Sequence, residues 1–378
     1  MSLLSGGLGY IVPFLVVLTV LVFVHELGHY LVARRNGVRI EVFSIGFGPE
    51  LLGWFDRAGT RWKLSAIPLG GYVKMFGDAD ASSSLPTGVI ETMTAEERRV
   101  SFHHKRLGQR FAVVVAGPAA NFIFAMLILA VLYATAGQPF TPPEVVQVQP
   151  NSAAAKGGIK PGDRILRVDG ERIERFEDVQ QAVRLNDGVP MHILVRRGDA
   201  EVALTVTPQI TPMTDRFGNV HHIALLGIGG SGVDYVRRNP VAAVGWAAEE
   251  TWNLTSGTLT ALWQMVIGAR TTEELGGPLR IAQMSGEMAQ GGVVALIVFM
   301  AMLSVNLGLI NLFPIPVLDG GHLLFYVAEA IRGKPLGQKA QEYGFRIGLA
   351  LVLTLMVFAT WNDLVHIGIV EFFRGLIS

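Results

Sequence analysis

The stretch that decides the fold is YIVPFLVVLTVLVFVHELGHYLVA at residues 10–33, whose first fifteen residues carry no charge. It is long enough for a helix to cross a bilayer, which takes about 20 apolar residues. It also contains His25-Glu26-Leu27-Gly28-His29, which places three ionisable side chains inside an apolar helix. An ionisable group at mid-bilayer costs about 2.5–3.5 kcal/mol, so the cluster needs a compensating partner.

The spacing of the two histidines predicts a metal site. Residues four apart lie on one face of a helix, so the imidazoles of His25 and His29 are expected to hold one zinc ion, with Glu26 beside it as general base. The chain has no cysteine, so its metal ligands must be His, Asp or Glu. The simpler alternative is a pair of core histidines, and the cost of burying unpaired polar groups counts against it.

A third ligand is expected because catalytic zinc usually takes three protein ligands and leaves one position open. Asp319 is our prediction, since it closes an apolar run in NLFPIPVLDGGH at residues 311–322. Pro314 and Pro316 break the helix there, and irregular backbone at membrane depth is tolerated only where it lines a buried or watery site. His322 is the competing ligand, and an ordinary boundary position is the simpler alternative for Asp319.

Three more segments are apolar enough to span a membrane, at residues 111–136, 291–318 and 345–362. Only 16% of the residues are charged and 50% are hydrophobic, against about 25% charged in soluble domains. The composition predicts a polytopic α-helical membrane protein with about four transmembrane helices in a lipid bilayer. The formal net charge of zero gives no indication of nucleic-acid binding. A signal peptide fits the first segment poorly, because the first basic residue is Arg34.

Lysine and arginine are concentrated at residues 34–110, which predicts a cytoplasmic loop there and an external N-terminus. Segment 137–290 is then external, and 319–344 returns to the cytoplasm. The predicted domains are 1–137 (two transmembrane helices, HExxH and a cytoplasmic or re-entrant β-hairpin loop), 138–238 (a small domain), 239–290 (amphipathic helices) and 291–378 (the last two transmembrane helices).

The external segment has two patterns. Residues 144–208 alternate apolar and polar side chains in short runs, which predicts a small β-rich domain with one helix near residues 176–185. Residues 239–290 carry apolar side chains at helical spacing, which favours interfacial amphipathic helices over a fifth span. A packed pair of soluble helices is the alternative for this second part.

Several stretches together carry a family resemblance: VHELGH (24–29), FSIGFGP (43–49), IPLGGYVKM (67–75), VAGPAANF (115–122) and NLGLINLFPIPVLDGGHLL (306–324). The chain resembles the site-2 protease family of intramembrane zinc metalloproteases, most closely its bacterial regulator-of-sigma-E protease branch. The resemblance implies zinc on His25, His29 and Asp319, water activation by Glu26, and a place for Asn311 near the active site.

The family also carries periplasmic PDZ domains between its second and third spans. NSAAAKGGIKPGDRILRVDGERI at residues 151–173 looks like one, whereas the best-known members carry two. In the family this fold is circularly permuted, so LLGIGG at residues 225–230 is either its displaced carboxylate-binding loop or a glycine-rich linker. The implied fold therefore includes a membrane-associated β-hairpin and an extracytoplasmic PDZ-like α+β domain.

The resemblance implies regulated intramembrane proteolysis of single-span membrane proteins that another protease has already cut, such as an anti-sigma factor or a remnant signal peptide. It implies the bacterial inner membrane, with the N-terminus and PDZ-like domain periplasmic and the active site near the cytoplasmic side. A non-catalytic PDZ scaffold and a zinc-dependent transporter are the rival classes.

Residues 61–76, RWKLSAIPLGGYVKMF, predict a β-hairpin with its turn at about Pro68–Gly71. Its second strand is expected to offer a free edge to an extended substrate. A hairpin that only braces the first two spans is the alternative. The predicted substrate-binding or oxyanion-orienting residues are Gly70, Gly71, Tyr72, Val73, Lys74 and Asn311.

Overall fold

The structure, a computed structural model, describes residues 2–77, 93–214, 220–231, 234–237, 239–268 and 276–366. The chain divides into two compact units. One comprises Met1–Leu129, Ala247–Thr255 and Gly277–Thr360, and the other comprises Ala130–Trp246, Ser256–Gly276 and Trp361–Ser378. The predicted metal ligands all belong to the first unit.

Helices dominate the described part of the first unit. They are α1 (Ser2–Arg35), α2 (Ala95–Val100), α3 (Leu107–Thr135), α6 (Pro240–Val266), α7 (Pro278–Gln290), α8 (Val293–Asn311), α9 (Asp319–Arg332) and α10 (Gln338–His366), of which α3, α6 and α10 extend into the second unit. Among the described residues, four helices are long and apolar enough to cross a membrane, at Leu8–Arg35, Leu107–Thr135, Val293–Asn311 and Lys339–Leu364. The four predicted apolar segments are thus confirmed as helices of that kind.

The third of these helices is shorter than predicted. Helix α8 stops at Asn311 rather than continuing to residue 318. Pro314 and Pro316 lack the backbone N–H that a helix needs, so the chain runs as an irregular loop until α9 begins at Asp319. The loop therefore delivers Asp319 as the first residue of a new helix.

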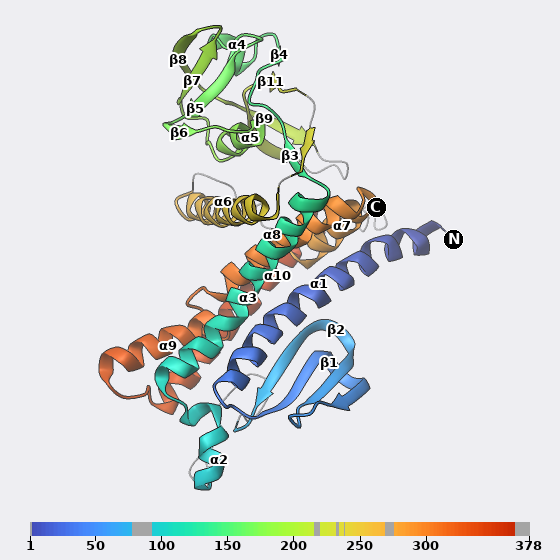
Figure 1. The fold of residues 1–378 in the computed structure, drawn as a ribbon, viewed down its shortest axis with the longest axis vertical. Coiled ribbons are helices and arrows are strands. Elements are labelled where there is room, and N and C mark those ends of the chain that lie inside the picture. Colours follow the sequence, from blue (N-terminus) through green and yellow to red (C-terminus); the bar gives the residue numbers. More distant parts are fainter. Residues whose placement is uncertain are drawn as a thin grey trace, which may run out of the picture. The chain divides into compact units, whose positions relative to one another are not determined.

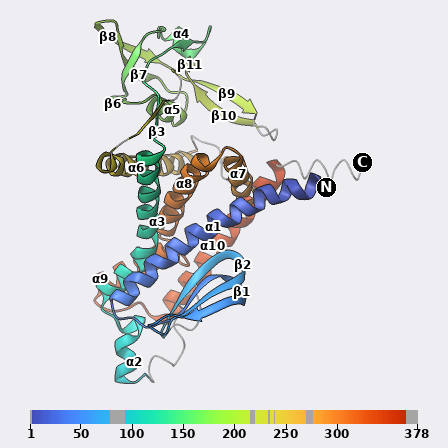
Figure 2. The same ribbon diagram turned by 45° about the vertical axis from the view of Figure 1, so that its right-hand side comes forward.

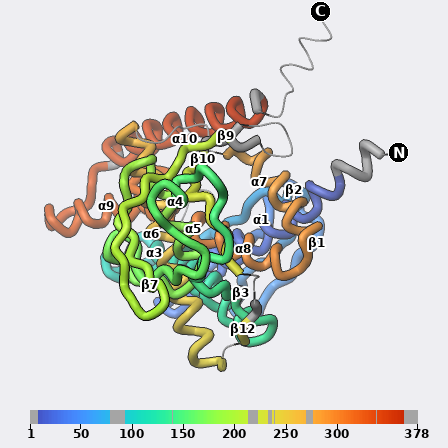
Figure 3. Tube along the Cα trace, turned by 90° about the horizontal axis from the view of Figure 1, so that it is seen from above, coloured from blue at the N-terminus to red at the C-terminus, as the bar shows by residue number. Residues whose placement is uncertain are grey.

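Strands β1 (Ile40–Phe55) and β2 (Arg61–Met75) form a long antiparallel hairpin beside α1 (Figures 1 and 2). Both strands lie beside α1 in the view from above as well (Figure 3). The hairpin curls on itself, because residues 42–45 pair with residues 71–74 on one side and with residues 61–64 on the other. Residues 71–75 therefore form one outer edge of the sheet, and residues 50–55 form the other.

The predicted reversal near Pro68–Gly71 is present as a bend within one long strand, because residues 61–64 and 71–74 run in opposite directions along residues 42–45. The predicted pairing is wrong, since these two segments lie on opposite sides of residues 42–45 and do not pair with each other. A second reversal, at Asp56–Thr60, joins β1 to β2. Asp56 Oδ1 accepts the backbone N–H groups of Ala58 and Thr60 at 2.8 and 3.0 Å, and Gly59 takes the positive φ of +83° that the turn requires. Pro68 and Gly70 lie in the bend between residues 64 and 71, where the strand pairing shifts.

The same aspartate fastens the hairpin to α1. Its Oδ2 accepts hydrogen bonds from the Tyr30 hydroxyl at 2.5 Å and from the Trp62 indole at 3.2 Å, and Arg34 lies 3.3 Å away. Burial raises the pKa of Asp56, but these hydrogen bonds outweigh it and lower that pKa to about 2. Asp56 is therefore ionised at neutral pH and holds the hairpin against the last turns of α1.

The second unit contains a small β-rich domain, as predicted. Its elements are β3 (Gln138–Phe140), β4 (Gln147–Val148), α4 (Ala153–Lys156), β5 (Arg164–Val168), β6 (Glu171–Arg172), α5 (Phe176–Arg184), β7 (Met191–Arg197), β8 (Ala200–Val206), β9 (Gln209–Thr214), β10 (Val220–Leu225), β11 (Ile228–Gly229) and β12 (Asp234–Val236). Strands β6, β5, β7 and β8 form the main sheet in that order. The expected helix near residues 176–185 is α5.

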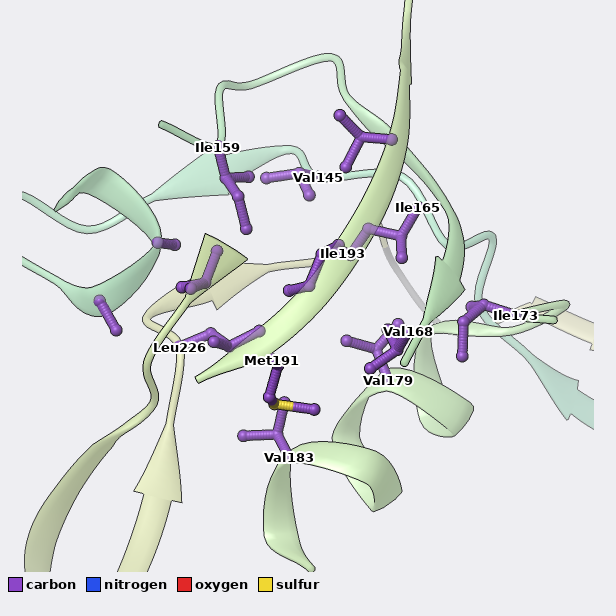
Figure 4. Packing of buried hydrophobic residues seen from close by; sticks show 14 of the residues in the cluster. Val145, Ile159, Ile165, Val168, Ile173, Val179, Val183, Met191, Ile193 and Leu226 are labelled. Carbon is purple, nitrogen blue, oxygen red and sulfur yellow. The ribbon is translucent and has the colours of Figure 1, made fainter. Parts of the chain in front are cut away.

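Alternating apolar residues of the sheet meet α5 in one core (Figure 4). Met191 and Ile193 of β7 pack near Val179 and Val183 of α5, and all four are almost fully buried. Leu226, from the LLGIGG segment, is 3% exposed and belongs to the same core, and Ile228 pairs with Val148 of β4. This segment is therefore built into the domain and is not a free linker.

Candidate metal centre

Three side chains converge between α1 and the start of α9. His25 Nε2 lies 3.1 Å and His29 Nε2 3.4 Å from Asp319 Oδ2, and the two Nε2 atoms are 3.2 Å apart. Within the part of the chain that the structure describes, these residues form the cluster of His, Asp and Glu suited to a metal ion. Both histidines are 9% exposed.

The spacing of these three atoms fits zinc. Ligand atoms about 2.0–2.2 Å from a tetrahedral zinc lie about 3.3–3.6 Å from one another, close to the separations of 3.1–3.4 Å observed here. The hydrogen bonding points the same way. His29 Nδ1 donates to the Val113 carbonyl at 2.8 Å, so in the neutral ring the Nε2 lone pair faces the carboxylate of Asp319. The lone pair and the carboxylate repel each other, and a cation bound between them would remove that repulsion.

Local backbone features deliver Asp319 to the site. Val317, two residues earlier, has φ +108°, a strained conformation for a β-branched residue. Gly320 and Gly321 lie directly against the carbonyls of Phe313 and Ile315, where a Cβ would overlap those oxygens. The start of α9 is thus folded tightly onto the loop that precedes it.

The far end of α9 is held by an ion pair. Arg110 of α3 donates to Glu329 at 2.5 Å, and both side chains are mostly buried. The same guanidinium lies 4.9 Å from the centre of the Tyr326 ring. Helix α9 is therefore fixed at both ends, which limits movement of Asp319.

The three ligands line a cavity of about 230 Å³ that also receives Glu26, Asn311 and His322. Gly71, Tyr72 and Val73 of the outer edge of the hairpin line it as well. The Val73 backbone donates a hydrogen bond to the Glu26 carboxylate. Three metal ligands, the Glu26 carboxylate, which is not one of those ligands, and a strand edge therefore surround one cavity.

Two of the predicted substrate-binding residues lie elsewhere. Gly70 does not line the cavity and packs its backbone, at φ +144°, against the Phe47 ring. Lys74 pairs with Glu41, with its Nζ 3.1 Å from Oε2. His322 lines the cavity but is not one of the three converging ligands.

Helix α3 supplies contacts to both histidines that the sequence pattern did not predict. The Val113 carbonyl binds His29, and the Asn121 amide lies 3.2 Å from His25 Nδ1. Gly117 lies between them, and a Cβ there would overlap the His29 imidazole. Gly117 and Asn121 belong to VAGPAANF at residues 115–122, one of the stretches that carry the family resemblance. These residues are uncharged, so the sequence does not indicate that they contact a metal site.

Three ligands around an open cavity are the pattern of a catalytic rather than a structural metal site. A family model described as peptidase family M50 matches residues 13–355. The chain therefore belongs to peptidase family M50, the site-2 proteases, and is a zinc metalloprotease. Intramembrane proteolysis is the general activity of this family.

Named relatives agree with this family. A protein of Agrobacterium fabrum called "Putative zinc metalloprotease Atu1380" is 50% identical over 360 residues, which cover 94% of this chain and 96% of the relative. Metalloprotease MmpA of Caulobacter vibrioides is 38% identical over 396 residues, covering 99% of this chain and all of the relative. The PDZ domain of an SdrC-like protein from Listeria monocytogenes is similar to 24% of this chain, at 18% identity and a TM-score of 0.20.

Gly117→Ala is expected to weaken zinc binding by about 5- to 150-fold, because overpacking a tight contact costs about 1–3 kcal/mol and the new methyl group meets the His29 imidazole. Gly108→Ala is the matched control, since that position on α3 has open space around it. Zinc affinity measured by chelator competition on both purified variants checks this. Equal affinities would show that α3 does not shape the site.

Proposed function

We propose that this chain hydrolyses peptide bonds inside the membrane-spanning segments of single-span proteins, with zinc held by His25, His29 and Asp319. The observation that carries the proposal is the convergence of these ligands, Glu26 and a strand edge on one cavity. Zinc held there would polarise the scissile carbonyl and make water acidic. Substrates pre-cut by another protease, such as an anti-sigma factor or a remnant signal peptide, are the proposed class.

Glu26 is the proposed proton carrier. Its carboxylate accepts a proton from the attacking water and returns it to the leaving amide nitrogen. The hydrogen bond from the Val73 backbone orients this carboxylate within the cavity. Asn311 lines the same space and is proposed to orient the substrate carbonyl.

The outer edge of the hairpin is the proposed substrate-binding strand. Residues 71–75 pair with β1 on one side only, and Gly71, Tyr72 and Val73 line the cavity. An extended substrate segment adds to such an edge by backbone hydrogen bonds. The exposed apolar side chains of the hairpin support its association with the membrane: Phe47, Leu51, Leu52, Trp54, Phe55, Ile67 and Leu69.

The proposed location is the bacterial inner membrane, with the N-terminus and the β-rich domain periplasmic and the active site near the cytoplasmic side. The concentration of Lys and Arg at residues 34–110 supports this orientation. A topology reporter fused after Gly198 would then read external. A cytoplasmic reading would reverse the proposed orientation.

The β-rich domain is proposed to be PDZ-like and to exclude substrates with bulky external domains. In the LLGIGG segment, Leu226 lies in the core and residues 228–229 pair with β4, an arrangement that suits a displaced carboxylate-binding loop. Deleting residues 144–232 is therefore expected to permit cleavage of untrimmed substrates, measured by immunoblot of the membrane fraction. If deletion abolishes cleavage of trimmed substrates instead, the domain recruits substrates or supports the fold.

The function is tested with the purified full chain in liposomes and a single-span substrate. Cleavage within the apolar segment, lost on chelation and restored by zinc, is the expected result, and mass spectrometry of the products gives the cleaved bond. A non-catalytic PDZ scaffold would bind the substrate and leave it intact. A zinc transporter would move zinc across the liposome membrane without any cleavage.

A further inference from the structure

Asn121 of α3 lies directly behind the proposed metal site. Its side chain is fully buried, and its amide nitrogen Nδ2 lies 3.2 Å from Nδ1 of His25. Its amide oxygen Oδ1 is buried too and has no hydrogen-bond partner among the described residues. A buried acceptor left unpaired costs about 1–3 kcal/mol, so this arrangement calls for an explanation.

The proposed zinc site supplies one. His25 directs Nε2 toward Asp319 and His29, so a metal there binds Nε2 and the proton of the neutral ring is on Nδ1. Nδ1–H is then a donor, and it would face the Nδ2–H groups of Asn121, which are donors as well. Turning the amide by 180° brings Oδ1 to Nδ1–H, which replaces two facing donors by a hydrogen bond, and it moves Nδ2 to the position that Oδ1 leaves. The two ends of an amide have nearly the same shape, so the turn changes no packing.

We infer that Asn121 is a positioning residue that accepts the Nδ1–H of His25 through Oδ1 and thereby directs the Nε2 lone pair of His25 at the metal. The inference rests on the proposed metal ligands. It gives His25 the kind of outer partner that His29 has in the Val113 carbonyl. Such partners orient metal-binding imidazoles and raise their basicity.

The placement on α3 supports this role. Val113, Gly117 and Asn121 are spaced four apart and so share one face of the helix. The first binds His29, the second makes room for the imidazole of His29, and the third faces His25. Ser304 of α8 donates to the Asn121 carbonyl at 2.8 Å, which fixes this turn of α3 to a neighbouring helix.

Two substitutions of opposite chemistry test the inference, with zinc affinity of the purified full chain as the readout. Asn121→Leu keeps the size and removes the acceptor, so we expect zinc to bind about 10- to 100-fold more weakly. Asn121→Asp offers only acceptors, so we expect it to bind zinc at least as tightly as wild type. Gln138→Leu, which removes a fully buried amide in the second unit, should leave zinc affinity unchanged.

The outcomes separate the alternatives. If Asn121→Asp binds zinc as weakly as Asn121→Leu, the amide donates to His25 and the inference is overturned. Unchanged affinity in Asn121→Leu overturns it as well. His25→Ala tests the proposed metal site itself. Full zinc affinity in that variant would show that His25 is not a ligand, and the proposed metal site would then be wrong, whatever the role of Asn121. If Asn121→Leu does not fold, the affinity of Asn121→Asp alone decides.

Discussion

Glu26→Gln is expected to bind zinc as wild type does and to lose proteolysis by about 10²- to 10⁴-fold, the share of rate that general acid–base catalysis supplies. Glutamine keeps the shape of the side chain and still accepts the hydrogen bond from Val73, but it takes no proton from water. Glu26 is not one of the three converging ligands, so the metal should stay. Metal analysis and single-turnover cleavage of a single-span substrate in liposomes measure both quantities.

Asp319→Ala is the matched comparison, because it removes a ligand and leaves the base in place. It should lose zinc and activity together, whereas Glu26→Gln should separate them. Full zinc occupancy in Asp319→Ala would remove that residue from the ligands and promote His322, which lines the same cavity. Loss of zinc in Glu26→Gln would contradict its assignment as a base.

The spans of this fold were predictable because long apolar segments have few alternatives to a helix in a membrane. The hairpin was predictable in existence but not in pairing. Residues 71–75 pair with residues 40–45 rather than with residues 61–64, and the turn at Asp56–Thr60 depends on hydrogen bonds to the Asp56 side chain. Pro68 and Gly70 do mark a reversal of the chain, but residues 42–45 separate the two segments that it joins.

The candidate site divides in a similar way. His25, Glu26 and His29 follow from helical spacing alone, and the proline-broken helix end points to Asp319. Val113 and Asn121 of α3 lie 84 and 96 positions from the histidines that they contact, and Gly117 lies between them. They act through a backbone carbonyl, a missing side chain and a neutral amide, and the sequence pattern of an apolar helix reveals none of these. Their contacts with the histidines can be identified only from the three-dimensional packing of α1 against α3.

A large effect on the rate of cleavage is also expected from Val73→Pro, because a membrane helix must unwind before it can be cleaved. A helical substrate holds its amides in internal hydrogen bonds, and unwinding it in lipid costs several kcal/mol for each unpaired group. The outer edge at residues 71–75 is proposed to replace those bonds. Val73→Pro removes one backbone donor, so a helix-stable substrate should be cleaved up to about 150-fold more slowly, the equivalent of losing about 1–3 kcal/mol. Zinc content should not change.

The Val73 donor also binds Glu26, so one substrate alone would not distinguish unwinding from a disturbed base. A second substrate, with a helix-breaking Gly or Asn near the scissile bond, makes the distinction because it needs less help to unwind. Damage to the base slows both substrates equally, whereas loss of the edge slows the helix-stable substrate more. Leu52→Pro, on the opposite edge of the sheet, is the control and should slow neither. Equal slowing of both substrates by Val73→Pro would contradict the unwinding role. Unchanged cleavage of both substrates would contradict the edge-strand proposal, since a strand that binds substrate beside the metal loses affinity when its backbone donor is removed.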